Sequence, residues 1–224
     1  MRPWCAALGT FFFACPAFVS AGAEPAANPQ PGTEIKLDVR KFQVVERDSG
    51  PVSYYRVIEE DGTTMIRAQY RPPLETVTMG MEVPDAVRSK VKFLRWRWRV
   101  LTFPKDADEC SGGRSDSAAA VFVTFKRGLK YYILKYAWTT MSRKGAVCNK
   151  RRNPFMNRDT SVMEVDGPIN TWLSEQIDPK AEFVRHFGGT LSDVPDFVGI
   201  GLMTDGDQTK SLSEADYADF SVTT

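Results

Sequence analysis

The chain has 224 residues, with 29 Lys or Arg, 28 Asp or Glu and one His, which gives a formal net charge of +1. This near-neutrality argues against an ordinary nucleic-acid-binding protein, which is usually basic overall, so we expect no nucleic-acid partner. Hydrophobic residues at 42% and aromatic residues at 12% argue against a disordered chain. The single His excludes His-rich metal sites and any mechanism that needs two imidazoles.

The N-terminal segment has the pattern of a secretory signal peptide. Arg2 supplies a positive charge, residues 4–19 are almost all apolar, and Ala21-Gly22-Ala23 fits the cleavage motif. The apolar stretch is shorter than the roughly 20 residues of a membrane-spanning helix, and we expect no transmembrane segment later in the chain. We therefore expect residues 1–23 to be removed and the protein to be periplasmic or secreted, with lipidation at Cys15 as the alternative.

Removal of this segment also changes the charge and cysteine counts. Without Arg2 the chain has 28 basic and 28 acidic side chains, and without Cys5 and Cys15 it keeps only Cys110 and Cys148. Two cysteines in an exported protein predict a disulfide, whereas two free thiols are the alternative. Two Cys and one distant His do not complete a zinc site.

Residues 24–34 are rich in Pro and Ala and predict a flexible lead-in to a single domain at 35–224. In that domain the hydrophobic period is two, which is typical of strands. The predicted strands cover residues 35–39, 52–58, 63–70, 76–83, 93–101, 118–125, 130–139, 161–165, 197–203 and 217–222. The strands at 118–125 and 130–139 are apolar on both faces, so we place them centrally in a sheet.

A helix is expected from Pro179 to His186, after a turn at Trp172–Ile177, because apolar residues recur at helical spacing behind a Pro in the first turn. Many short strands with one or two short helices predict a mainly β fold, an antiparallel β-sandwich of jelly-roll type. His186 is interpreted as a helix-terminal His favoured by the helix dipole, with a catalytic base as the alternative.

Charge is unevenly distributed, with 17 Lys or Arg against four acids in residues 88–152. Within that region Arg95, Arg97 and Arg99 share one face of a strand, about 7 Å apart. Such a row requires negative partners, either acids of a neighbouring strand or an anionic ligand. We take these three arginines as candidate ligand-binding residues.

Two further groups carry candidate binding roles. Tyr136 and Trp138 lie at the end of a predicted strand, where exposed rings would stack on sugars, with core packing as the alternative. Asp205 and Asp207 flank Gly206 after another strand and offer oxygen ligands for Ca²⁺, with a turn capped by Asp side chains as the alternative. Ca²⁺ is the one cofactor that the sequence suggests.

No catalytic motif stands out. Ser-His-Asp catalysis has no support because no G-x-S-x-G segment occurs. Glu164 and Glu175 are interpreted as surface acids, not as the paired carboxylates of a glycosidase. A lyase could use Arg97 to neutralise a uronate carboxylate and Tyr132 or His186 as the base. Nothing in the sequence brings these three residues together.

The order of several segments resembles the bacterial domain of unknown function family numbered 3047. The segments that carry the resemblance are FLRWRWRV, AAVFVTF, YYILKYAW, NPF, TWLSEQIDPKAEFVRHFG, GIGLMTDGDQT and YADFSV, within residues 38–223. The resemblance implies an exported β-sandwich, similar in architecture to carbohydrate-binding jelly rolls, and implies no activity. Around Lys144–Arg152 the chain departs from the pattern, which suggests that the Cys110 and Cys148 pair is a local addition.

Taken together, these patterns favour an exported, non-catalytic binding module of the bacterial envelope whose ligand is a glycan or another anionic molecule. Two alternatives remain open: a polysaccharide-cleaving lyase or hydrolase on the same scaffold, and a structural envelope protein.

Overall fold

The computed structural model describes residues 32–47 and 53–224, and Gly32–Thr224 form one compact unit. The predicted signal segment at 1–23 and most of the predicted lead-in lie outside the described residues. Glu34, expected in the lead-in, is instead the first residue of a strand. Within the described ranges, no helix has the length and apolarity needed to cross a membrane.

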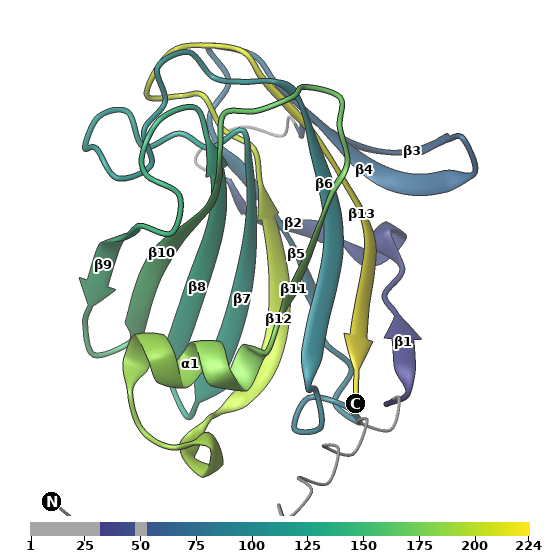
Figure 1. The fold of residues 1–224 in the computed structure, drawn as a ribbon, viewed down its shortest axis with the longest axis vertical. Helices are drawn as coiled ribbons and strands as arrows, with labels where there is room; N and C mark the ends of the chain where they lie inside the picture. The colour runs from purple at the N-terminus through teal and green to yellow at the C-terminus, as the bar shows by residue number, and fades with distance from the viewer. Residues whose placement is uncertain (1–31, 48–52) are drawn as a thin grey trace, which may run out of the picture. The chain divides into compact units, whose positions relative to one another are not determined.

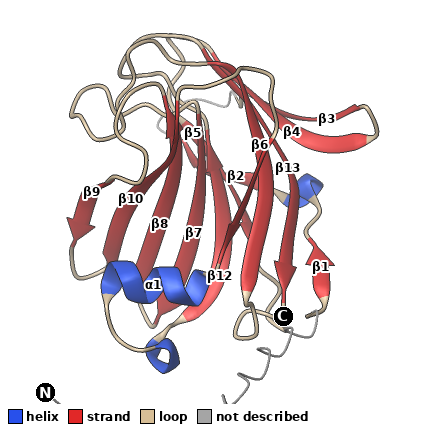
Figure 2. Cartoon of the chain, viewed as in Figure 1, coloured by secondary structure: helices blue, strands red, loops and turns tan. Residues whose placement is uncertain are grey.

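The strands form two sheets that pack face to face (Figures 1 and 2). One sheet contains β1 (Glu34–Lys36), β3 (Tyr55–Glu60), β4 (Thr63–Tyr70), β6 (Phe93–Thr102), β11 (Leu173–Ile177) and β13 (Ser213–Thr223). Its order is β11-β6-β13-β4-β3, and β1 also pairs with β13.

The second sheet contains β2 (Gln43–Arg47), β5 (Val77–Glu82), β7 (Ala119–Arg127), β8 (Lys130–Thr139), β9 (Val147–Arg152), β10 (Met156–Val165) and β12 (Asp196–Met203). Its order is β2-β5-β12-β7-β8-β10-β9. The pair β8–β10 is parallel, because the chain crosses over through residues 140–155 before β10 begins, and the other pairs of this sheet are antiparallel. This is the mainly β sandwich of jelly-roll type that the sequence predicts.

The predicted helix is confirmed as α1 (Pro179–Phe187), which begins where Asp178 accepts hydrogen bonds from the backbone of Lys180 and Ala181. It crosses the lower ends of β10, β8 and β7 in Figure 1. Two 3₁₀ turns, at Val39–Lys41 and Leu191–Asp193, complete the helical elements of the described chain.

Three strands were not predicted from the sequence: β2, β9 and β11. Residues 173–177 form the strand β11 instead of a turn, because they pair in antiparallel register with β6 at the sheet edge. The strand β9 was missed altogether, since its sequence is mostly polar and shows no apolar alternation. Pairing with β10 is what makes it a strand.

Tyr136 and Trp138 are core side chains, which corrects their prediction as stacking platforms. They are 1% and 0% exposed. Tyr136 packs against Trp96 at 5.9 Å between ring centroids, and Trp138 packs against Trp98 at 5.8 Å. The physical reason is strand alternation: both rings share the inward face of β8 with Leu134, so neither offers a face to a ligand.

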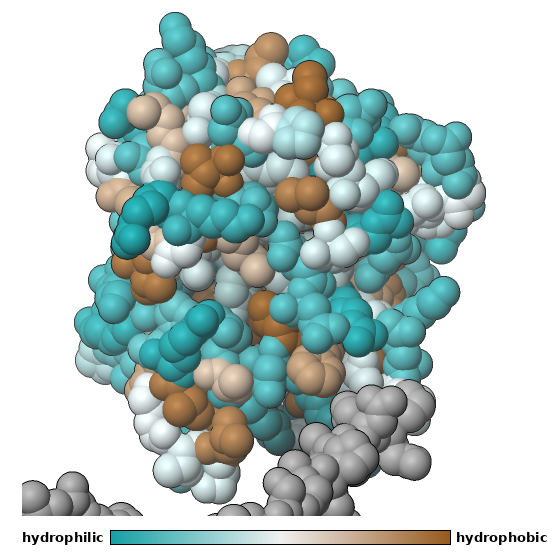
Figure 3. All heavy atoms as spheres, viewed as in Figure 1, coloured by the Kyte–Doolittle hydropathy of each residue, from teal (hydrophilic) through white to brown (hydrophobic). Residues whose placement is uncertain are grey.

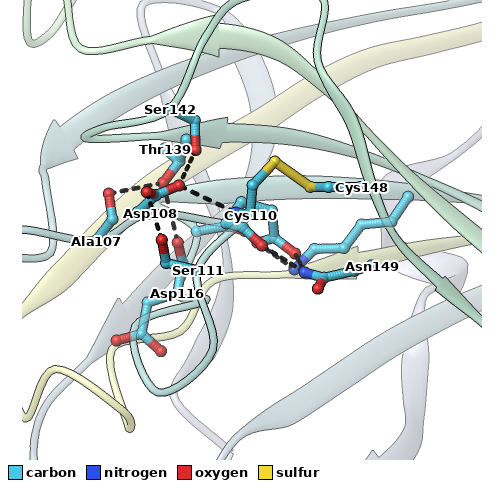
Figure 4. The surroundings of a disulfide bond; sticks show 12 residues. Ala107, Asp108, Cys110, Ser111, Asp116, Thr139, Ser142, Cys148 and Asn149 are labelled. Atoms are coloured by element: carbon cyan, nitrogen blue, oxygen red, sulfur yellow. Dashed lines mark hydrogen bonds and ion pairs between the residues drawn. A yellow bond between two sulfur atoms is a disulfide. The ribbon is translucent and has the colours of Figure 1, made fainter.

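The disulfide between Cys110 and Cys148 is confirmed, with Cα atoms 5.4 Å apart and 38 residues of sequence separation. It ties the loop before β7 to β9, and Asn149 beside it donates a hydrogen bond to the backbone carbonyl of Glu109 (Figure 4). The covalent link therefore holds a mostly polar edge strand in place.

Replacing both cysteines with Ser is expected to lower the free energy of unfolding by about 4 kcal/mol, from the loop-closure entropy of a 38-residue separation. Urea unfolding of the double variant beside oxidised and reduced wild-type protein measures this loss. Equal stability of all three proteins would contradict a structural role for the bond.

Candidate binding groove

The outer face of the seven-stranded sheet is the candidate site, and strand alternation in β7 and β8 creates it. Val121, Val123 and Phe125 of β7 are fully buried between the sheets. The residues between them, such as Phe122 and Thr124, therefore point to the opposite face and line a groove there.

The groove is about 1700 Å³ in volume and spans the sheet from β2 to β9. Strand register assembles it from residues far apart in sequence. One cross-strand row runs through Glu82, Gly199, Thr124, Ile133, Arg158 and Arg151. The next row runs through Gln43, Gly80, Gly201, Phe122 and Lys135. The site is thus a surface across neighbouring strands.

Glycines keep part of the floor of the groove flat. A Cβ added to Gly201 would lie 3.2 Å from Cβ of Phe122, and one added to Gly80 would lie 2.8 Å from a methyl group of Val45. Side chains at these positions would fill space that is now part of the groove. The β5–β12 half of the groove therefore leaves room for an extended molecule lying on the sheet.

The lining of the groove is basic, above all in the half formed by β7 to β9. Eight Lys or Arg line the groove against three acids, which are Glu82, Glu109 and Asp205. The basic residues are Arg40, Lys41, Arg88, Lys126, Lys135, Lys150, Arg151 and Arg158. Among them, Lys41, Lys126, Lys150 and Arg151 are exposed and form no ion pair with another described residue. The groove therefore presents uncompensated positive charge.

Tyr131 is the exposed aromatic residue of the basic half. Its side chain is 40% exposed, and Nζ of Lys126 lies 5.2 Å from its ring centroid. Sequence reasoning selected Tyr136 and Trp138 from the same strand and missed Tyr131. Lys135 could have pointed to Tyr131, because residues four positions apart in a strand lie on the same face and a Lys is expected on the outward one.

One end of the groove holds a buried charge cluster. Nζ of Lys135 lies 2.8 Å from Oε2 of Glu109, and both side chains are at least 95% buried. Asp205 lies nearby, with its Oδ1 accepting a hydrogen bond from the backbone of Ser117 at 2.6 Å. Burial raises the pKa of the Asp205 carboxyl well above its usual range, and Lys135 opposes that rise.

Asp205 and Asp207, predicted to hold Ca²⁺, are joined in the structure by Asp116, and one carboxylate oxygen of each lies within 4.8 Å of the others. Asp116 caps the turn, accepting hydrogen bonds from the backbone of Gln208 and Thr209. Burial, together with the charge of Asp116, raises the pKa of Asp207. The three carboxylates supply the oxygen ligands that Ca²⁺ prefers. Binding of Ca²⁺ at this cluster stays a prediction.

The arginine row lies on the other sheet, away from the groove. Arg99 contacts Asp216 at 2.7 Å and Glu60 at 2.9 Å, and Arg97 contacts Asp219 at 2.8 Å. Arg95 donates a hydrogen bond to Gln176 at 2.6 Å and lies 3.6 Å from Glu34. The arginines thus have negative partners on other strands of their own sheet, in line with the first of the two alternatives for the row. Their ligand-binding role stays a prediction.

His186 lies in the last turn of α1, where its Nδ1 is 3.1 Å from Oδ2 of the buried Asp159. Although burial opposes it, hydrogen bonds from Arg152 and His186 hold the pKa of Asp159 below its usual range. Tyr132 packs against the aromatic rings of α1. The structure therefore does not bring Arg97, Tyr132 and His186 together as a lyase site.

Replacing Asp205 with Asn is expected to stabilise the protein increasingly as the pH rises from about 4 to 7. The folded wild-type protein holds a proton on this raised carboxyl that the unfolded chain releases above about pH 4, so wild-type stability falls with rising pH. One such group contributes at most about 1.4 kcal/mol per pH unit. Urea unfolding across this pH range checks the difference between the two proteins.

Ca²⁺ provides the control for this prediction. A bound cation would favour the ionised carboxylates, so that with Ca²⁺ the wild-type protein would become the more stable of the two at neutral pH. Millimolar Ca²⁺ is expected to raise the melting temperature of the wild-type protein and not that of Asp207→Asn. A difference between wild-type protein and Asp205→Asn that stays constant with pH would contradict a buried, protonated Asp205.

Known structures with a similar arrangement include a family 11 carbohydrate-binding module from Clostridium thermocellum in complex with a β-1,3-1,4-mixed-linked tetrasaccharide, at 11% identity and a TM-score of 0.46, covering 87% of this chain and 96% of that chain. Another is the xyloglucanase domain of NopAA, a type three effector from Sinorhizobium fredii, in complex with cellobiose, at 9% identity and a TM-score of 0.46, covering 88% and 99%. At these scores we draw no functional argument from the likenesses.

No curated protein matches the chain. A family does: residues 42–221 match the family described as "Protein of unknown function (DUF3047)". The matched range covers most of the chain and contains nearly all of the segments on which the sequence resemblance rests. The chain therefore belongs to this family.

Proposed function

We propose that the protein is a non-catalytic binding module of the bacterial envelope and that it binds an extended acidic polymer, foremost an acidic glycan, in the groove of the seven-stranded sheet. The observation that carries this proposal is the excess of basic side chains lining an open groove of about 1700 Å³. We further propose that it acts in the periplasm or outside the cell, which the N-terminal sequence pattern and the disulfide support.

The two halves of the groove suit different parts of such a polymer. Gly80, Gly199 and Gly201 leave a flat floor on which sugar rings can lie. Lys126, Lys150 and Arg151 offer charge to carboxylate or sulfate groups at the other half. Tyr131 adds an exposed aromatic ring on which a sugar ring can stack.

Charge reversal in the groove is expected to weaken binding. The double variant Lys126→Glu/Arg151→Glu should bind polygalacturonate or alginate about tenfold more weakly or worse than wild type, since exposed charges are removed and replaced by repulsive ones. Calorimetric titration and affinity electrophoresis measure the loss. Fully methyl-esterified polygalacturonate, which keeps the same backbone without the charge, should bind wild type weakly.

The matched control is Lys36→Glu/Lys92→Glu, which changes net charge equally at two exposed positions, one in β1 and one directly before β6. This variant should bind acidic polymers like wild type. Equal loss in both double variants would show that only net charge counts, and no binding of either acidic polymer by wild type would reject the proposal.

A second candidate function, cleavage of the bound polymer, is favoured by one observation. Two buried carboxylates, Glu109 and Asp205, line the same end of the groove in different electrostatic surroundings. Lys135 neutralises Glu109, whereas burial favours a protonated Asp205. Two carboxyl groups in different surroundings at one site are an arrangement that general acid–base chemistry uses.

If the groove cleaves its polymer, wild-type protein should release reducing ends or an unsaturated product from an acidic glycan, and Asp205→Asn should not. Chromatography of the polymer after prolonged incubation detects either product. An unchanged polymer with retained binding would leave the binding module as the function and reject cleavage of the polymers tested.

A further inference from the structure

Apolar side chains project from turns at one end of the seven-stranded sheet. Leu129, in the β7–β8 turn, is 83% exposed, and Phe155, in the β9–β10 turn, is 66% exposed. Leu191, in the 3₁₀ turn after α1, is 62% exposed. These turns lie at the lower end of the sandwich in Figure 1, where Figure 3 shows hydrophobic atoms at the surface among hydrophilic ones.

Contacts within the chain place these turns beside one another. The backbone carbonyl of Phe155 accepts a hydrogen bond of 2.8 Å from the amide of Tyr131, two residues after Leu129. Arg127, at the start of the β7–β8 turn, donates to the backbone carbonyl of Asp193 in the turn that holds Leu191. Three separate turns thus form one surface.

Basic residues lie within four positions of Leu129 and Phe155 in the sequence. Leu129 lies between Arg127 and Lys130, and Phe155 follows Arg151 and Arg152. The bases outnumber the acid of these three turns, Asp193, whose pKa is lowered by hydrogen bonds from Thr190. Long basic side chains around an exposed apolar tip let the tip enter a hydrocarbon layer while the charges stay at the headgroups.

We propose that this end of the sandwich docks on an anionic lipid surface, with Leu129 and Phe155 entering the interface and the flanking bases contacting acidic headgroups. The pattern favours a membrane over a protein partner, because Leu129 and Phe155 each combine an exposed apolar side chain with basic residues of the same turn or the strand beside it. The surface adjoins the groove and shares Arg151 with it, but Leu129, Phe155 and Leu191 do not line the groove. The proposal does not depend on the ligand of the groove.

Flotation with vesicles tests the proposal. Wild-type protein without its N-terminal 23 residues should float with vesicles of phosphatidylcholine and phosphatidylglycerol and should not float with phosphatidylcholine alone. Binding should fall as salt rises. The double variant Leu129→Ser/Phe155→Ser should partition at least about tenfold more weakly, because two apolar side chains no longer enter the interface.

Ile169→Ser is the matched control, since Ile169 is 60% exposed in the turn between β10 and β11, at the opposite end of the strands. This variant should float like wild type, and all variants should keep the wild-type melting temperature. Failure of the wild type to float with anionic vesicles would overturn the proposal, as would equal flotation of the double variant and the Ile169→Ser control.

Discussion

The arrangement of this protein depends on one constraint, the alternation of side chains in the two central strands of the seven-stranded sheet. β7 and β8 bury one face completely against the six-stranded sheet, including Val121, Val123, Leu134 and Trp138. Their other face then has to line the open side of the sheet. A register slip of one residue would move the aromatic core into solvent, so packing of the core also fixes the composition of the groove.

The distribution of charge follows from the same two-sheet arrangement. The acids near the C-terminus, Asp216 and Asp219, lie on β13 and pair with the arginines of the adjacent β6. Burying such a pair costs desolvation, which the hydrogen bonds of Arg99 with Asp216 and Glu60 offset. The acids of β13 are thus paired on the six-stranded sheet, whereas the exposed bases of β7 and β9 remain at the groove. Overall neutrality therefore conceals a locally basic surface.

Much of the fold was predictable from the sequence, because period-two alternation is a local property. It identified the central strands, and the composition at Pro179–His186 identified the helix. The edge strands β2, β9 and β11 were not predictable in this way, since pairing with a neighbour decides their conformation. The disulfide was accessible from a cysteine count alone.

The groove was harder to predict, because its residues come from strands scattered along the chain and only the register brings them together. Lys135 and Tyr131 lie on the outward face of β8. The sequence analysis instead chose the aromatic residues Tyr136 and Trp138, which lie on the inward face. Glu109 gave no signal, since its place at the groove depends on the loop held by the disulfide.

The central claim is that an acidic polymer binds across the seven-stranded sheet and not along the arginine row of the six-stranded sheet. Amide chemical-shift mapping by NMR with an acidic oligosaccharide tests this claim most directly. Perturbed amides should cluster around Lys126, Tyr131 and Arg151, with those of β6 unchanged. Perturbations centred on Arg95 and Arg97, with an unaffected groove, would contradict the claim.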